Sequence, residues 1–264
     1  MVSDSTTRKP DPLTVATDVA REAGSLLLAR AGGPLDVREK GRRADLVTLA
    51  DNASEKLIIA RLRSSFPRAA ILAEESGSSA GSNDERWIVD PLDGTTNFAH
   101  GYPIYCVSIA YERAGECIAA VVYAPAMNEL FAAERGGGAT CNGRSIVVSS
   151  IGLLGEAMVC TGFHPADFSR NAKYFEAASN HAQAVRRDGS AALDLAYTAC
   201  GRFDGFWEFD LSPWDVAAGT LIVLEAGGRV TRVDGSPSSV DARSILASNG
   251  RIHSEFSQLL QLGG

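Results

Sequence analysis

The chain lacks several features that would assign it to a class of protein at once. Its 264 residues contain no apolar run near the roughly 20 residues that a membrane-spanning helix needs. Residues 1–10 are polar and have no apolar core of a secretory signal, so we expect a loose tail and a cytoplasmic protein. The net charge of −7 argues against a nucleic acid or an anionic membrane as the main partner.

The sequence also lacks the motifs of several enzyme mechanisms. No GxSxG segment is present, the glycine run 136–138 has no GxGxxG spacing, and the four histidines lack the spacing of metal ligands. The cysteines are odd in number, widely spaced and mostly in apolar segments, which favours buried free thiols over disulfides or a metal cluster. They are Cys106, Cys117, Cys141, Cys160 and Cys200.

What is present is the composition of an ordinary soluble globular protein, with 45% hydrophobic and 22% charged residues. A first helix is predicted from Asp11-Pro12 to Gly32, and further helices over 48–64, 168–182, 190–200, 212–226 and 250–262. Strands are predicted over 69–73, 87–89, 106–111, 117–123, 129–133, 158–161, 184–187, 205–209, 228–233 and 245–247, with a Ser/Gly-rich loop over 77–83. The strand–helix alternation after residue 150 favours a layered sandwich with a largely parallel or mixed sheet.

The most informative segment is 90–98, Asp-Pro-Leu-Asp-Gly-Thr-Thr-Asn-Phe, which follows the apolar strand 87–89. A strand that ends in a tight turn can direct Asp90, Asp93, a carbonyl and a threonine hydroxyl at one small volume. Oxygen ligands of this kind select hard cations such as Mg²⁺, and the N–H groups of the turn can bind a phosphate. On its own, however, the segment also suits an ordinary acidic turn.

Other acids stand at the ends of predicted elements. Glu74 and Glu75 follow a strand that can neighbour the strand before Asp90; their side chains diverge, so at most one faces Asp90, and both also suit surface charge. Asp215 lies in Ser212-Pro213-Trp214-Asp215, which suits a helix capping box as well as a metal ligand. Glu208 ends a strand, and Asp45 precedes the second helix.

Three of these segments, in this order and spacing, resemble the signature of the inositol monophosphatase family. They are 73–76 (Ala-Glu-Glu-Ser), 90–98 and 214–219 (Trp-Asp-Val-Ala-Ala-Gly), and the resemblance extends from Asp45 to beyond Gly228. It implies a Mg²⁺-dependent, lithium-sensitive phosphatase that forms a homodimer. The implied fold is α+β, the layered α-β-α-β-α sandwich of the inositol monophosphatase and fructose-1,6-bisphosphatase type. We expect one structural unit in which a lobe of residues 11–150 carries most metal ligands and a lobe of residues 151–264 completes the site.

The resemblance also implies roles for individual residues. Glu74, Asp90 and the carbonyl of Leu92 would hold one Mg²⁺. Asp90, Asp93 and Asp215 would hold a second, and Glu74 would help to bind a third. Thr95, braced by Asp45, would orient the attacking water together with Glu74. The N–H groups of Gly94 and Thr95 would hold the phosphate at a helix start. The residues implied to contact substrate are Asp93, Gly94, Thr95, Gly189, Ser190, Ala191, Glu208 and Asp215; Asp188 departs from the pattern, which has a less charged residue there.

The residues after Asp-Gly-Thr help to choose among substrates. Thr96, Asn97 and Phe98 resemble the branch that hydrolyses myo-inositol monophosphate, by direct attack of a metal-activated water. Histidinol phosphate, fructose-1,6-bisphosphate and nucleotide 3′-phosphates remain alternatives. So does a regulatory or RNA-associated protein on this fold, because a fold alone does not determine function.

Overall fold

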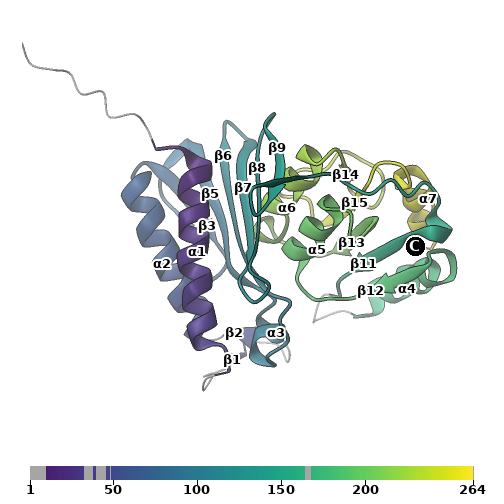
Figure 1. Cartoon of the computed structure of the whole chain (residues 1–264), viewed down its shortest axis with the longest axis horizontal. Helices are drawn as coiled ribbons and strands as arrows, with labels where there is room; N and C mark the ends of the chain where they lie inside the picture. The colour runs from purple at the N-terminus through teal and green to yellow at the C-terminus, as the bar shows by residue number, and fades with distance from the viewer. Residues whose placement is uncertain (1–9, 33–37, 40–45, 48, 164–167, 264) are drawn as a thin grey trace, which may run out of the picture.

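The protein is a five-layered sandwich in which helices and sheets alternate (Figure 1). The structure, a computed structural model, describes residues 10–32, 38–39, 46–47, 49–163 and 168–263. The predicted α-β-α-β-α sandwich of class α+β is confirmed. Among the described helices, none is long and apolar enough to cross a membrane.

The first sheet has eight strands in the order β10-β9-β8-β7-β6-β5-β3-β4. They are β3 (Ala69–Ala73), β4 (Gly77–Ser79), β5 (Ser82–Asp93), β6 (Cys106–Arg113), β7 (Glu116–Ala124), β8 (Glu129–Glu134), β9 (Gly138–Cys141) and β10 (Arg144–Ile146). Strands β3 and β5 run parallel, with Ala73 opposite Val89. The strand that ends at Glu74 therefore does lie beside the strand that carries Asp90, as expected.

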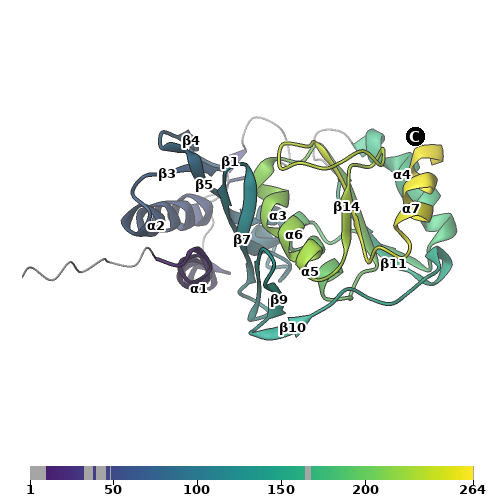
Figure 2. The same cartoon turned by 90° about the horizontal axis from the view of Figure 1, so that it is seen from above.

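Two helices cover the outer face of this sheet, α1 (Pro12–Arg30) and α2 (Leu49–Ser65) (Figure 2). Helix α1 begins where Asp11-Pro12 predicts, because Asp11 Oδ2 accepts the N–H of Thr14 at 2.9 Å. Apolar side chains of both helices, such as Leu27 and Ile58, pack against the sheet around Trp87. This layer holds α2 over the ends of β3 and β5.

The second sheet has five strands in the order β12-β11-β13-β15-β14. They are β11 (Met158–Thr161), β12 (Ala184–Arg186), β13 (Gly205–Phe209), β14 (Arg229–Thr231) and β15 (Ser244–Ser248). Strand β11 is parallel to β12 and β13, whereas β15 is antiparallel to its neighbours, so the sheet is mixed.

The central layer consists of α5 (Ala191–Ala199) and α6 (Pro213–Glu225), which lie between the two sheets. Small residues permit their close approach: a Cβ on Gly219 would lie 2.5 Å from the Cβ of Leu195. Helices α4 (Phe168–His181) and α7 (His253–Gly263) cover the outer face of the second sheet around Trp207 and Phe256. A single turn of 3-10 helix (Leu154–Glu156) follows the connection between the sheets, and the short strands β1 (Arg38–Glu39) and β2 (Leu46–Val47) pair with each other.

The loop predicted over residues 77–83 is wrong: it contains β4 and the start of β5, because a polar edge strand needs only backbone pairing, here of Leu72 with Ser78. After Asp93 the chain forms a short helix, α3 (Thr95–Ala99), which begins where the family resemblance implies a helix start. All five cysteines are free, as expected. The division into lobes 11–150 and 151–264 stays a prediction.

Candidate active site

The segment 90–93 owes its geometry to a bulge at the end of β5. In a regular strand, residues three apart face opposite sides of the sheet. Here Asp90 pairs with Ser108 and Asp93 pairs with Cys106, so three steps along β5 correspond to two along β6. Because Ser108 and Cys106 share one face, the extra residue brings Asp90 and Asp93 to the same side of the sheet.

The negative charges of Glu74, Asp93 and Asp215 act on Asp90 at the end of β5. Burial raises the pKa of Asp90 well above its usual value, and the charges of Glu74, Asp93 and Asp215 raise it further. Asp90 is 2% exposed and accepts the N–H of Leu92 at 2.9 Å. The structure thus brings together the four acids that sequence reasoning proposed as metal ligands, from the ends of β3 and β5 and the start of α6.

Asp93 joins the end of β5 to the start of α5. Its Oδ2 accepts the hydroxyl of Ser190 at 2.8 Å and the N–H of Ala192 at 2.7 Å. Burial raises the pKa of Asp93 to about 6, although these hydrogen bonds oppose the shift. The predicted substrate segment 189–191 is therefore attached directly to a predicted metal ligand.

Asp215 caps helix α6 and also lies close to the other acids of the site. The capping box at the start of α6 is formed, with the Ser212 N–H donated to Asp215 Oδ2 at 2.7 Å. Its charge also contributes to the raised pKa of Asp90. The cap fixes the carboxylate at the helix start, and the position of α6 between the sheets directs it at Asp90.

Thr95 has a partner that sequence reasoning did not identify. Its Oγ1 lies 3.0 Å from Asp51 Oδ1 and 3.1 Å from the carbonyl oxygen of Leu92. Asp45, the predicted brace of Thr95, lies outside the described residues. Asp51 stands in the first turn of α2 and is fully buried.

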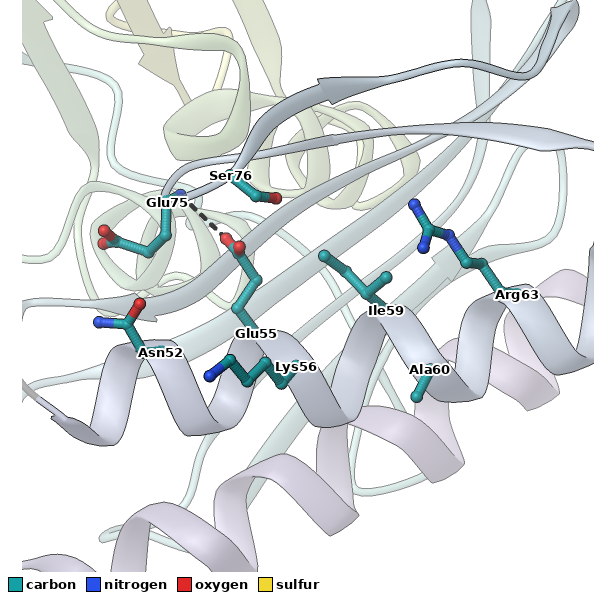
Figure 3. A pocket seen from close by; sticks show the side chains of 8 residues that line it. All are labelled: Asn52, Glu55, Lys56, Ile59, Ala60, Arg63, Glu75 and Ser76. Carbon is teal, nitrogen blue, oxygen red and sulfur yellow. Dashed lines mark hydrogen bonds between the residues drawn. The ribbon is translucent and has the colours of Figure 1, made fainter.

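The face of α2 that bears Asp51 holds two further parts of the site. Ser54 donates its hydroxyl to the carbonyl of Pro91 at 2.9 Å, and Glu55 Oε2 accepts the N–H of Glu75 at 2.9 Å. Figure 3 shows the Glu55 contact, at the edge of an open pocket of about 360 Å³ between α2 and the loop after β3. Asp51, Ser54 and Glu55 stand at positions i, i+3 and i+4 of the predicted helix, and this polar spacing was the sequence signal that could have identified the face. The structure shows that all three residues are buried.

The opposite wall of the site comes from the second half of the chain. Burial raises the pKa of Glu208 well above its usual value, and the charges of Asp215 and Asp93 add to the effect. A Cβ on Gly162 would lie 2.1 Å from Glu208 Oε1, so the absence of a side chain at Gly162 leaves the Glu208 carboxylate its present position. Asn97 of α3 donates its amide to the carbonyl of Asp188 at 2.8 Å, which ties α3 to the segment 189–191. The predicted substrate residues thus surround the acids.

The donor set fits Mg²⁺. Glu74, Asp90, Asp93 and Asp215 are oxygen donors, and Mg²⁺ binds through carboxylates in preference to nitrogen or sulfur. Burial and then the charges of three other acids raise the pKa of Asp90, and a bound divalent cation would reverse the effect of those charges.

Comparisons with known proteins agree with this geometry. The family model described as "Inositol monophosphatase family" matches residues 9–262. An "Inositol-1-monophosphatase" of Synechocystis sp. is 45% identical, over 94% of this chain and 88% of that protein. A "Nus factor SuhB" of Pseudomonas aeruginosa is 44% identical, over 90% of this chain and 91% of that protein. The crystal structure of the extragenic suppressor protein suhB from Bartonella henselae superposes with a TM-score of 0.91 at 41% identity, over 95% of this chain and 98% of that one.

Proposed function

The chain belongs to the inositol monophosphatase family and is a phosphatase, and we propose that it hydrolyses myo-inositol monophosphate with Mg²⁺ as cofactor. The observation that carries the proposal is the group of carboxylates around the buried Asp90, with Glu74, Asp93 and Asp215 acting on it, beside the hydrogen-bonded pair Thr95 and Asp51. Relatives named for inositol 1-phosphate hydrolysis support the choice of substrate. The family is metal-dependent; the number of ions, two or three, is part of the proposal.

The carboxylates would hold the cation in the arrangement that the resemblance implies: Glu74 and Asp90 with the Leu92 carbonyl, and Asp90 with Asp93 and Asp215. When bound, Mg²⁺ supplies positive charge to the phosphoryl oxygens and favours ionisation of a neighbouring water. The N–H groups of Gly94 and Thr95, at the start of α3, have no partners within that helix and would donate to the phosphate.

Thr95 and Asp51 would position the attacking water. The Thr95 hydroxyl has one proton, and donating it to Asp51 leaves the oxygen lone pairs of Thr95 to accept a hydrogen from water. Asp51, a buried carboxylate, would then accept the proton that the water loses, by way of Thr95. Glu74 would orient the same water from the end of β3.

The site contains a thiol, but direct attack by water fits it better than a covalent mechanism. Cys106 Sγ lies 3.9 Å from Asp93 Oδ2. Burial, followed by the charge of Asp93, raises the pKa of the Cys106 thiol well above its usual value. A thiol held in its protonated form is a poor nucleophile.

The segment 189–191 and Glu208 would receive the hydroxyl groups of the substrate. Ser190 and Ala192 hydrogen-bond Asp93, so the segment is fixed relative to the reacting phosphate. Glu208 lies against Gly162, and the charges of Asp215 and Asp93 act on it. A polyol fits these polar groups, which supports inositol over an apolar alcohol.

The homodimer and the cytoplasmic location remain proposals. Sedimentation equilibrium of the purified chain tests the homodimer.

The test is phosphate release by the purified full chain from inositol 1-phosphate, fructose-1,6-bisphosphate, histidinol phosphate and a nucleotide 3′-phosphate. We expect the highest kcat/KM for inositol 1-phosphate, a requirement for Mg²⁺, and loss of activity on chelation. Asp93→Asn keeps an oxygen that can accept from Ser190 and Ala192 but removes the charge, so it should abolish turnover without unfolding α5. Normal Mg²⁺-dependent turnover by this variant would refute the proposed site.

A further inference from the structure

A second cluster of possible ligand atoms adjoins the catalytic acids and is not used by the phosphatase mechanism. Cys160 lies in β11, Asp188 in the connection after β12, and Asp194 in α5. The Cys160 sulfur and one carboxylate oxygen from each aspartate all lie within 4.8 Å of one another. Cys160 and Asp194 are fully buried, whereas Asp188 is half-buried and gives the cluster its open side.

Asp194 is the unusual member of this cluster. Both of its carboxylate oxygens are buried, and neither has a hydrogen-bond partner in the part of the chain that the structure describes. Other buried aspartates are satisfied: Asp90 accepts the N–H of Leu92 at 2.9 Å, and Asp204 accepts the N–H of Met158 at 2.7 Å. A buried carboxylate without partners costs several kcal/mol, so a proton or a cation must compensate it.

The charges around Asp194 are of the sign that attracts a cation. Burial raises its pKa well above the usual value, and the charges of Asp188 and Glu208 raise it further. The Cys160 thiol lies close enough to the Asp194 carboxylate to act in the opposite direction, lowering the pKa of Asp194. Burial raises the pKa of Cys160 in turn, and the charges of Asp194 and Asp188 contribute. A cation would reverse these shifts, since a thiol that coordinates a metal is deprotonated.

The three side chains come from rigid parts of the fold. Strand β11 is paired on both sides, with Cys160 opposite Arg186 of β12 and Phe206 of β13. The N–H of Asp194 donates to the carbonyl of Ser190 at 2.9 Å in the first turn of α5. The carbonyl of Asp188 accepts the amide of Asn97 at 2.8 Å. Ligands held in this way need little reorganisation to bind an ion.

We propose that Cys160, Asp188 and Asp194 form a second cation site, for a thiophilic divalent ion such as Zn²⁺. A thiolate with two carboxylates suits Zn²⁺, which accepts both sulfur and oxygen ligands, whereas Mg²⁺ avoids sulfur. Three protein ligands leave a fourth position for water on the Asp188 side. The site therefore differs in chemistry from the oxygen-only group around Asp90, and it does not depend on the phosphatase assignment.

Co²⁺ is the probe that separates the two sites. In the reduced, metal-free full chain, Co²⁺ bound to a thiolate gives a charge-transfer absorption in the near ultraviolet, which oxygen ligands do not give. We expect this band to saturate with one ion per chain and to disappear when Zn²⁺, which binds more tightly, is added. Cys160→Ser should abolish the band. Asp194→Asn should weaken Co²⁺ binding at this site by more than about tenfold, because even loss of an outer partner costs roughly 10–100-fold.

Matched variants identify which thiol is responsible. Cys117→Ser removes a buried thiol far along the first sheet, and Cys106→Ser removes the thiol nearest to Asp93; both should keep the band. Asp93→Asn should also keep it while losing phosphatase activity, so failure of either proposal can be recognised. The absence of a band in the wild-type chain overturns the cation site and means that Asp194 is neutralised by a proton. A band that survives in Cys160→Ser, or that is lost in Cys106→Ser alone, overturns it as well.

Discussion

Asp51→Asn tests the proton path most directly. Asp51 is fully buried, and its Oδ1 accepts the Thr95 hydroxyl at 3.0 Å, while the Leu92 carbonyl competes for the same proton at 3.1 Å. Asparagine has nearly the same shape and keeps one oxygen that can accept the hydroxyl. It has no charge and cannot take up a proton. The substitution therefore removes the base and leaves most of the packing.

The expected loss follows from the role of Asp51. A positioned general base contributes about 10²–10⁴-fold to rate. At about 1.4 kcal/mol for each factor of ten, this corresponds to roughly 3–5 kcal/mol of transition-state stabilisation. Because Asp51 is buried behind Thr95 and does not reach the substrate, KM should change little. The fall should appear in kcat, and equally in kcat/KM.

The assay is steady-state phosphate release from inositol 1-phosphate at saturating Mg²⁺, with unfolding free energies measured in parallel. Ser54→Ala is the matched control, since Ser54 lies one turn further along the same face of α2 and is also buried. Loss of its hydrogen bond to Pro91 should cost about 0.5–1.5 kcal/mol of stability and less than about tenfold in kcat. If Asp51→Asn reduces kcat no more than Ser54→Ala does, the reasoning about the base is wrong.

Three further predictions concern two contacts of the site and the buried His253 of helix α7. In Gly162→Ala the new Cβ would lie 2.1 Å from Glu208 Oε1, so the carboxylate must move. The KM should then rise about tenfold with a smaller change in kcat, and an unchanged KM would show that Glu208 does not contact substrate. Glu55→Ala removes the acceptor of the Glu75 N–H at 2.9 Å and should raise the Mg²⁺ concentration for half-maximal activity. Glu55→Gln keeps an acceptor and should behave like wild type. Equal effects of the two variants would contradict the role of Glu55 in positioning the loop after β3. Burial lowers the pKa of His253 from 6.5 to about 4, so its neutral form is favoured in the folded state. The free energy of unfolding should therefore fall as the pH decreases from about 6.5 to about 4. His253→Gln should flatten this part of the pH dependence of stability in thermal unfolding experiments.

Much of the fold followed from local pattern. The helix start at Asp11-Pro12, the capping box at Ser212 and Asp215, and the consecutive strands between residues 106 and 134 are all present. Local signals of this kind depend on backbone preferences and on periodicity, which neighbouring residues determine. The prediction was wrong for β4, whose pairing at the edge of the sheet leaves no apolar pattern in the sequence. The short helix α3 was implied by the family resemblance and not by the local pattern.

The candidate site likewise has some features that the sequence shows and others that only the structure shows. The residues of the segment 90–98, and their oxygen-donor chemistry, can be read from the sequence. The bulge that turns Asp90 and Asp93 to one side exists only as a register between β5 and β6. The partner of Thr95 is Asp51, which is 44 residues away, and the partners of Asp93 are almost 100 residues away.

The sequence by itself therefore determined which residues can bind a metal and where the chain turns, because these properties belong to residue types and short segments. The tertiary structure alone decided which acids meet, which helix holds them, and that Cys160, Asp188 and Asp194 converge. Contacts between distant segments depend on how whole layers pack, and nothing in the local pattern specifies that packing.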